Sequence, residues 1–144
     1  MSLSDLRWVH EPEPRWDDAK ARILGGAPKG AFDARLLAST PGALLPGTWW
    51  RAERGSRVVG FGWMDVSWGD AEILLAVDAD EQGRGVGSYI LDQLEAEART
   101  MGLRYLTNLV RPSHARGDEV AAWLGRRGFR GSEDGRLLRA ACRS

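Results

Sequence analysis

Apolar residues in the middle of the chain alternate with polar ones or form short runs, which is typical of β-strands. Two turn-forming pairs, Gly55-Ser56 and Gly69-Asp70, divide this region. The pattern predicts three consecutive strands, at 48–54, 57–68 and 71–77. The last of them reads AEILLAV, and such a continuous apolar run indicates a strand that is buried on both faces of a sheet.

The next region changes to helical spacing. Its apolar side chains recur every three to four residues, at Ile90, Leu91, Leu94, Ala98 and Met101. This spacing predicts an amphipathic helix over 88–101 that ends at Gly102. Weaker patterns predict a strand at 6–10, helices at 15–24 and 31–39, a strand at 105–110, a helix ending near 127 and a hairpin around 133–135. The chain is therefore expected to form one α/β domain, residues 1–144, in the order β-α-α-β-β-β-α-β-α-β-β.

Composition narrows the cellular setting. The chain has 144 residues, no net charge and 43% hydrophobic residues, which are ordinary values for a globular protein. No apolar run approaches the ~20 residues that a membrane span needs, and the first residues contain no apolar signal-peptide core. Cys142 is the only cysteine, so an internal disulfide framework is excluded and a cytoplasmic location is expected.

Arginines are concentrated in the last third of the chain. Residues 99–144 hold ten arginines and four acidic residues. They do not form a dense basic run with interleaved aromatic residues, which argues against nucleic acid as a partner. Such arginines would serve a small ligand that carries phosphate equally well.

The motif that points to chemistry is EQGRGVG, residues 81–87, between a predicted strand and a predicted helix. Glycines at such a junction let backbone N–H groups point at one spot beside the positive end of the helix, which favours a bound phosphate. Arg84 can add a charge-assisted hydrogen bond. The alternative is a tight connection that binds nothing. The segment lacks the Gly-Lys-Ser/Thr of a P-loop, and Ser88 stands where a dinucleotide-binding fingerprint needs its last glycine.

The segment from Gln82 to Gly87 matches the pattern Q/R-x-x-G-x-G, and through it the chain resembles the GNAT N-acetyltransferases. The predicted element order and Gly128-Phe129 after the last predicted helix are similar to that family too. The resemblance implies an α/β (α+β) fold with a mixed, mostly antiparallel sheet of six to seven strands flanked by four helices. It also implies acetyl-CoA as the cosubstrate, no metal ion, and a pyrophosphate held by the loop amides. The residues it assigns to cosubstrate binding are Leu75, Ala76, Val77, Gln82, Gly83, Arg84, Gly85, Val86, Gly87 and Ser88.

By the same resemblance, an amine acceptor attacks the acetyl group directly in a ternary complex. An ammonium group has no lone pair, so a base that removes its proton would speed the attack. Glu72, at the start of the buried strand, is the expected catalytic residue. Asp65 and Asp70 lie nearby in the sequence and are weaker candidates.

The last predicted helix departs from the family pattern. Leu124 stands where many members have the tyrosine that protonates the departing thiolate, and Gly117 replaces a familiar asparagine. Either the thiolate leaves unaided, or Ser113 or His114 assists it. The departure supports an alternative function, that of a catalytically idle acyl-CoA-binding or regulatory interaction module.

The acceptor itself is not identified by the sequence. In the family, the first two helices, their loop and the strand hairpin line its site. Those segments here contain acidic and aromatic residues: Glu11, Glu13, Asp17, Asp18, Trp16, Trp49, Trp50, Trp63 and Trp68. This set suits a cationic amine, but the same residues equally suit a core and helix caps. The sequence does not distinguish acetyl from longer acyl donors, and a homodimer is expected only from the exposed edge that a strand at 137–141 would leave.

Overall fold

A computed structural model describes residues 5–108, 114–131 and 137–140. The elements follow the predicted order: β1 (Leu6–Glu11), α1 (Asp18–Gly25), α2 (Ala34–Leu37), β2 (Thr48–Arg54), β3 (Arg57–Ser67), β4 (Asp70–Val77), a 3-10 turn η2 (Ala79–Glu81), α3 (Val86–Thr100), β5 (Tyr105–Asn108), α4 (Gly117–Arg126), β6 (Arg130–Gly131) and β7 (Leu137–Ala140). The predicted turn of the last hairpin, 133–135, and the end of the predicted strand at 105–110 lie outside the described residues.

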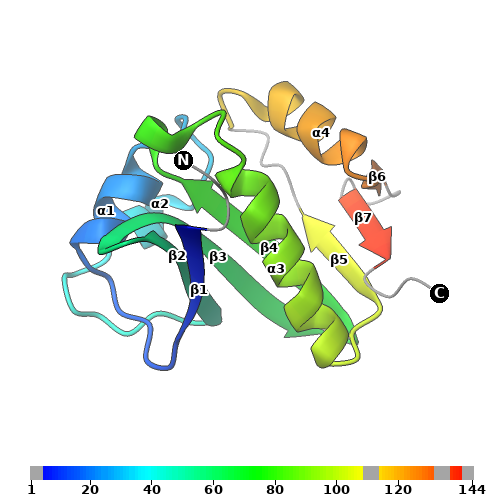
Figure 1. Ribbon diagram of the computed structural model, residues 1–144, viewed down its shortest axis with the longest axis horizontal. Helices are drawn as coiled ribbons and strands as arrows, with labels where there is room; N and C mark the ends of the chain where they lie inside the picture. The colour runs from blue at the N-terminus through cyan, green and yellow to red at the C-terminus, as the bar shows by residue number, and fades with distance from the viewer. Residues whose placement is uncertain (1–4, 109–113, 132–136, 141–144) are drawn as a thin grey trace.

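The strands form one seven-stranded sheet in the order β1-β2-β3-β4-β5-β7-β6 (Figure 1). All neighbouring strands are antiparallel except β4 and β5, which are parallel. The predicted mixed, mostly antiparallel sheet is thereby confirmed. The exposed edge expected at 137–141 is covered only in part, because the two-residue strand β6 pairs with Leu137 and Leu138 of β7 but not with Arg139 or Ala140. Residue 141 lies outside the described residues.

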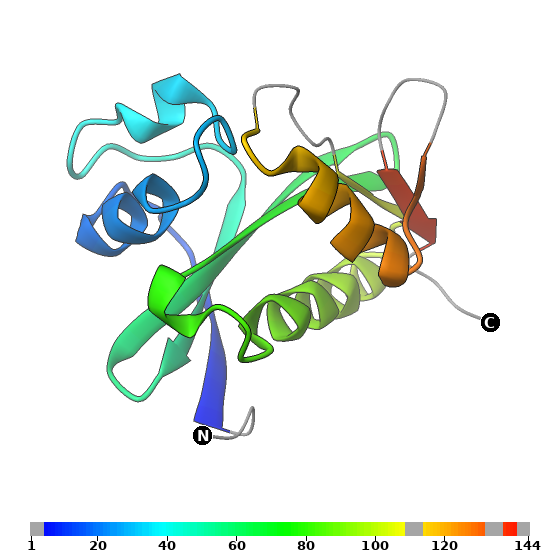
Figure 2. The ribbon, with the colours of Figure 1, turned by 90° about the horizontal axis from the view of Figure 1, so that it is seen from above.

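Helices cover both faces of the sheet, with α1 and α2 on one side and α3 on the other (Figure 2). The side chains of α3 and α4 share one core with Trp50, Met64 and Ile73 of the sheet. Those of α1 share a second core with Trp49 and Phe61. The buried central strand β4 contributes to both cores, as its apolar run predicted.

Two glycines of β3 bring α3 unusually close to the sheet. A Cβ atom on Gly60 would lie 2.7 Å from Cδ1 of Ile90, and one on Gly62 would lie 2.7 Å from the ring of Trp8. No side chain fits at such distances unless its surroundings shift. The helix therefore rests directly on the backbone of β3.

The helix α2 is shorter than the 31–39 expected from the sequence, because its boundaries are set by capping. The Asp33 side chain accepts the backbone N–H of Arg35 and so starts the helix, which ends after one turn at Leu37. The start of α1 is fixed in the same way, by Asp17, whose side chain accepts the N–H of Lys20. Asp17 was expected inside a helix over 15–24, but it is the N-cap residue that precedes α1.

Candidate active site

The parallel strands β4 and β5 separate after their first three residue pairs (Figure 1). Residues 70–72 pair with 105–107, and the Asn108 side-chain Nδ2 then donates to the carbonyl oxygen of Ile73 at 2.8 Å. Leu75, Ala76 and Val77 lie beyond this point, where no described residue of β5 pairs with them. Backbone N–H and C=O groups require partners, so this side of β4 is suited to an extended ligand that adds like a strand.

The glycine-rich loop leads from β4 to α3. Gly83 and Gly85 have φ angles of 76° and 83°, in the left-handed region that favours glycine. Gly85 is the N-cap of α3, and no side chain caps this end of the helix. The first backbone N–H groups of α3 have no acceptor within the helix, and they lie at the positive end of the helix dipole. This arrangement supports an anion site at the loop.

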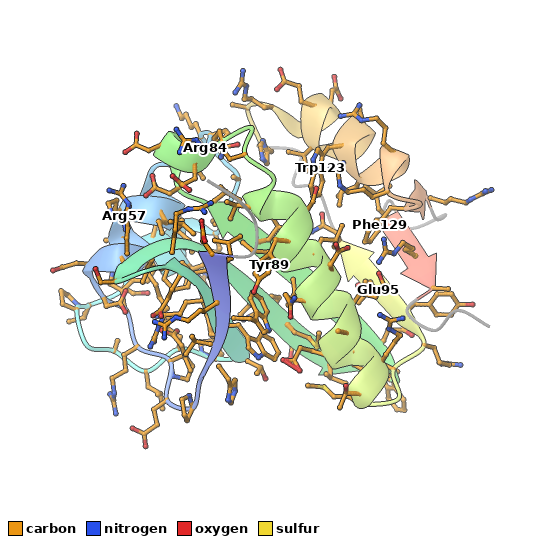
Figure 3. The ribbon with its side chains drawn as sticks, in the orientation of Figure 1. Arg57, Arg84, Tyr89, Glu95, Trp123 and Phe129 are labelled. Atoms are coloured by element: carbon orange, nitrogen blue, oxygen red, sulfur yellow. The ribbon has the colours of Figure 1, made fainter. Side chains whose placement is uncertain are left out.

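The Gln82 side chain links the loop to the end of β4, since its Nε2 donates to the carbonyl oxygen of Val77 at 3.3 Å. Arg84 lies 3.6 Å from the Glu81 carboxylate (Figure 3). The buried Glu81 also accepts a hydrogen bond of 3.1 Å from Arg54. The Arg84 guanidinium is more than half exposed and is thus held beside the loop rather than buried in an ion pair.

An arginine at the end of α4, which the sequence analysis did not single out, reaches the start of α3 with its side chain. Arg127 donates to the Ser88 Oγ at 2.7 Å and stacks over the Trp123 ring, with its Cζ 3.8 Å from the ring centroid. Trp123 of α4 points toward the start of α3, where a Cβ on Gly87 would lie 3.4 Å from its ring (Figure 3). Arg127 therefore adds positive charge beside the loop. Its spacing of four residues from Trp123 on one helix was the only sequence signal for the pair.

Asp78 anchors the segment between β4 and the loop. Its buried carboxylate accepts hydrogen bonds from Arg22 of α1, from Arg57 of β3 at 2.9 Å and from the backbone N–H of Asp80 at 3.0 Å. Burial alone would raise the pKa of Asp78, but the hydrogen bonds from Arg57, Asp80 and Arg22 outweigh it and hold the pKa below its usual range.

Asp78→Asn is expected to lower the free energy of unfolding at pH 7 by about 1 kcal/mol, because the charge-assisted bonds are lost while both half-exposed arginines regain water. The pKa of Asp78 is lower in the folded protein than in the unfolded chain, where it is about 3.9. The contribution of the carboxylate is thus complete well above that unfolded value and disappears as the pH falls through the folded value. Urea titrations of both proteins at pH 7, 5 and 3.5 should show the difference shrinking.

The control for this substitution is Asp80→Asn. Asp80 is 80% exposed and lies 3.3 Å from Arg57, so its loss should leave the unfolding free energy nearly unchanged. A difference between wild type and Asp78→Asn that stayed constant down to pH 3.5 would contradict the assignment.

Glu72 lies where β4 and β5 begin to separate. It is the last residue of β4 that pairs with β5, opposite Thr107, and on its other side it pairs with Asp65 of β3. The Glu72 side chain is half-buried and lines a cavity of about 540 Å³ between the sheet and the α1–α2 region. The walls of this cavity include Phe61, Trp63 and Leu74. Asp65 is solvent-exposed, and Asp70 does not line the cavity.

Two of the acidic residues expected near the acceptor serve the fold instead. Lys20 is completely buried, and its Nζ lies 2.7 Å from Oε1 of Glu11 and 3.4 Å from Oδ2 of Asp17. The Glu11 carboxylate also forms an ion pair with Arg51, whose Nη1 lies 3.1 Å from Oε2 of Glu11. Their charges are therefore balanced within the protein, which the sequence did not show because the burial of Lys20 depends on how α1 packs on the sheet.

Only some of the tryptophans expected near the acceptor lie at the cavity. Trp49 and Trp63 line the cavity, whereas Trp16 and Trp50 are buried in the two cores. Trp68 is 94% exposed at the β3–β4 turn. The predicted aromatic acceptor site is thus reduced to two of the five tryptophans.

The side chain at position 124 cannot supply the proton that the family's tyrosine would donate. Leu124 is 3% exposed and packs in the core beneath α4. The His114 Nδ1 accepts the backbone N–H of Arg116 at 2.9 Å, which gives this side chain a structural role before α4. Ser113 lies outside the described residues.

A family profile described as "Acetyltransferase (GNAT) domain" matches residues 46–130, more than half of the chain. The chain belongs to the GNAT acetyltransferase family. Membership confirms the predicted class of enzyme, an acyltransferase that uses acetyl-CoA and acts on an amine. A search of curated proteins found no match for this GNAT acetyltransferase.

Solved structures similar to this GNAT acetyltransferase share its fold at low sequence identity. The IAA acetyltransferase from Bacillus cereus is 18% identical, with a TM-score of 0.69 over 94% of this chain and 99% of that one. The ribosomal-protein-S18-alanine N-acetyltransferase from Escherichia coli is 20% identical, with a TM-score of 0.64 over 96% of each chain. The PaiA N-acetyltransferase from Thermoplasma acidophilum, solved in complex with coenzyme A, is 16% identical, with a TM-score of 0.52 over 62% of this chain and 57% of that one. These similarities confirm the predicted fold.

Within residues 5–108, 114–131 and 137–140, no helix is long and apolar enough to cross a membrane. The same residues contain no group of three histidine, cysteine or acidic side chains placed to hold a metal ion.

Proposed function

We propose that residues 82–88 of this acetyltransferase hold the pyrophosphate of acetyl-CoA, that Leu75–Val77 bind its extended arm, and that Glu72 is the general base. The observation that carries the proposal is the course of β4. From Glu72, its last residue paired with β5, this strand continues along a side where no described residue of β5 pairs with it. The turn η2 and the glycine-rich loop then connect it to the start of α3, which no side chain caps. The three groups that the reaction needs thus follow one another along a single strand and its loop.

The residues present fit the cosubstrate. Bound at this site, acetyl-CoA supplies the acetyl group as a reactive thioester. The backbone amides at Val86–Ser88 and the guanidinium groups of Arg84 and Arg127 would neutralise its phosphates. The β4 backbone would orient the acetyl end toward the point where the two strands separate.

Glu72 would accept the proton that the attacking amine loses as its nitrogen bonds to the acetyl carbon. The carbon–sulfur bond would break after this attack, and CoA would leave as its thiolate. A thiol of pKa near 8.5 is a tolerable leaving group, so a buried leucine at position 124 is compatible with turnover. The family match and the cavity that opens beside Glu72 favour this enzyme over the idle module.

The decisive experiment is calorimetric titration with acetyl-CoA and CoA, followed by a free-thiol release assay with a panel of amines. Micromolar binding of both nucleotides and thiol release with at least one amine are expected. Binding without release from any amine would support the idle module. Absence of binding would refute the assignment of residues 82–88.

We further propose that residues 1–144 act as one catalytic domain in the cytoplasm, which the single cysteine, Cys142, supports. A homodimer through the edge at 137–141 stays part of this proposal, supported by the part of β7 that β6 does not cover.

A further inference from the structure

The cavity beside Glu72 has walls that are mostly apolar. Phe61, Trp63 and Leu74 line its sheet side, while Phe32, Leu36 and Leu45 line the side formed by α2 and the loops around it. Phe32 and Leu36 are only half-buried, although they pack against the second core. A ligand that covered them would remove apolar surface from water, which favours binding.

Three polar side-chain groups of these walls have hydrogen-bond partners within the protein. The indole N–H groups of Trp49 and Trp63 both donate to the Pro46 carbonyl oxygen, at 3.0 and 3.2 Å. The Ser39 hydroxyl donates to the carbonyl oxygen of Leu36 at 2.6 Å. A polar ligand group placed against these three side chains would therefore lose its water without gaining a new hydrogen-bond donor.

The position of the Trp63 ring depends on the backbone conformation at Gly47. Gly47, next to Pro46, has a φ of 82°, and a Cβ there would lie 2.2 Å from Nε1 of Trp63. Only glycine leaves room for the indole ring at this place. The aromatic wall is thus a fixed part of the cavity.

Few of the described residues that line the cavity are charged. Three charged side chains are among the described residues that line it, and two of them, Asp33 and Arg35, are exposed at the start of α2. The third is Glu72, whose strand neighbour in register is Asp65. The Glu72 carboxylate attracts the positive charge of an amine that enters the cavity.

We propose that the acceptor is a primary amine carried on an apolar, preferably aromatic, body: an aralkylamine whose ring fills the cavity and whose nitrogen lies at Glu72. This assignment rests on the proposed function of Glu72. A polyamine or a strongly polar amine would place much of its charge against walls that are mostly apolar.

The test uses calorimetric titration of CoA-saturated protein with 2-phenylethylamine and with spermidine. We expect 2-phenylethylamine to bind at least tenfold more tightly. Leu36→Asp should weaken its binding at least tenfold, because the new carboxylate faces the ring. Leu37→Asp is the matched control, since Leu37 is the neighbouring residue of the same short helix, is 40% exposed and does not line the cavity. It should leave the binding of 2-phenylethylamine unchanged.

Equal or tighter binding of spermidine, no detectable binding of 2-phenylethylamine, or equal effects of the two leucine substitutions would overturn the inference. Thiol release in the same samples separates it from the proposed function. Release with spermidine but not with 2-phenylethylamine would leave acetyl transfer intact and overturn the acceptor class. Tight binding of 2-phenylethylamine without release would keep the cavity assignment and contradict catalysis at Glu72.

Discussion

Replacing Gly85 with valine is expected to weaken acetyl-CoA binding roughly tenfold or more, which corresponds to about 1.4 kcal/mol. Gly85 has a φ of 83° at the N-cap of α3, where a β-branched side chain costs about 1–2 kcal/mol of backbone strain. The loop relieves that strain by moving to negative φ, and the amides that would hold the pyrophosphate then point elsewhere. Calorimetric titration of both proteins with CoA measures the loss.

Gly102→Val provides the matched control for this prediction. Gly102 follows the opposite end of α3 with a φ of 75°, and no atom lies within 4 Å of the site of its missing Cβ. The control variant thus introduces a similar strain without touching the loop. Both variants should lose similar thermal stability, but only Gly85→Val should lose affinity. Equal affinities of Gly85→Val and wild type would refute the loop assignment.

The second large effect is expected from Glu72→Gln, which should lower kcat/KM about 100-fold at pH 7.5 and leave the affinity for acetyl-CoA unchanged. General-base catalysis contributes about 10²- to 10⁴-fold, and glutamine keeps the size of the side chain without its ability to take a proton. Steady-state rates with an accepted amine measure the first quantity, and calorimetry measures the second.

The pH profile distinguishes a base from a residue that only shapes the cavity. Alkylamines lose their proton in water with a pKa near 10.4, so the reactive fraction rises about tenfold per pH unit below that value. The rate deficit of Glu72→Gln should therefore shrink toward pH 10. Asp65→Asn, on the neighbouring strand, should reduce the rate less. A larger loss from Asp65→Asn, or a deficit independent of pH, would remove Glu72 as the base.

Local patterns in the sequence predicted most of the fold. The Gly55-Ser56 turn, the apolar run of β4 and the helical spacing of α3 each depend on residues close together in the chain, so they were visible without a structure. The glycine loop was visible for the same reason, since left-handed φ angles restrict the residue type.

What the sequence did not show depends on contacts between distant segments. Glu11 was expected near the acceptor but pairs with Lys20, and the burial of that lysine follows from how α1 packs on the sheet. Arg127 approaches Ser88 across 39 residues, and β7 is inserted between β5 and β6. Which tryptophans line the cavity likewise depends on the register of β2 against β3, where Trp49 faces Trp63.

The close approach of α3 to β3 has a consequence for the cosubstrate. Gly60 and Gly62 lie in register with Val77 and Leu75, so they set how far the backbone of β4 stands from the helix whose first turn would hold the phosphates. Two residues of a neighbouring strand, outside the set assigned to cosubstrate binding, thereby determine the distance between the part of the site that would bind the extended arm and the part that would bind the phosphates. Any side chain at these positions would act as a spacer and lengthen that distance, even though the loop and Glu72 were left intact.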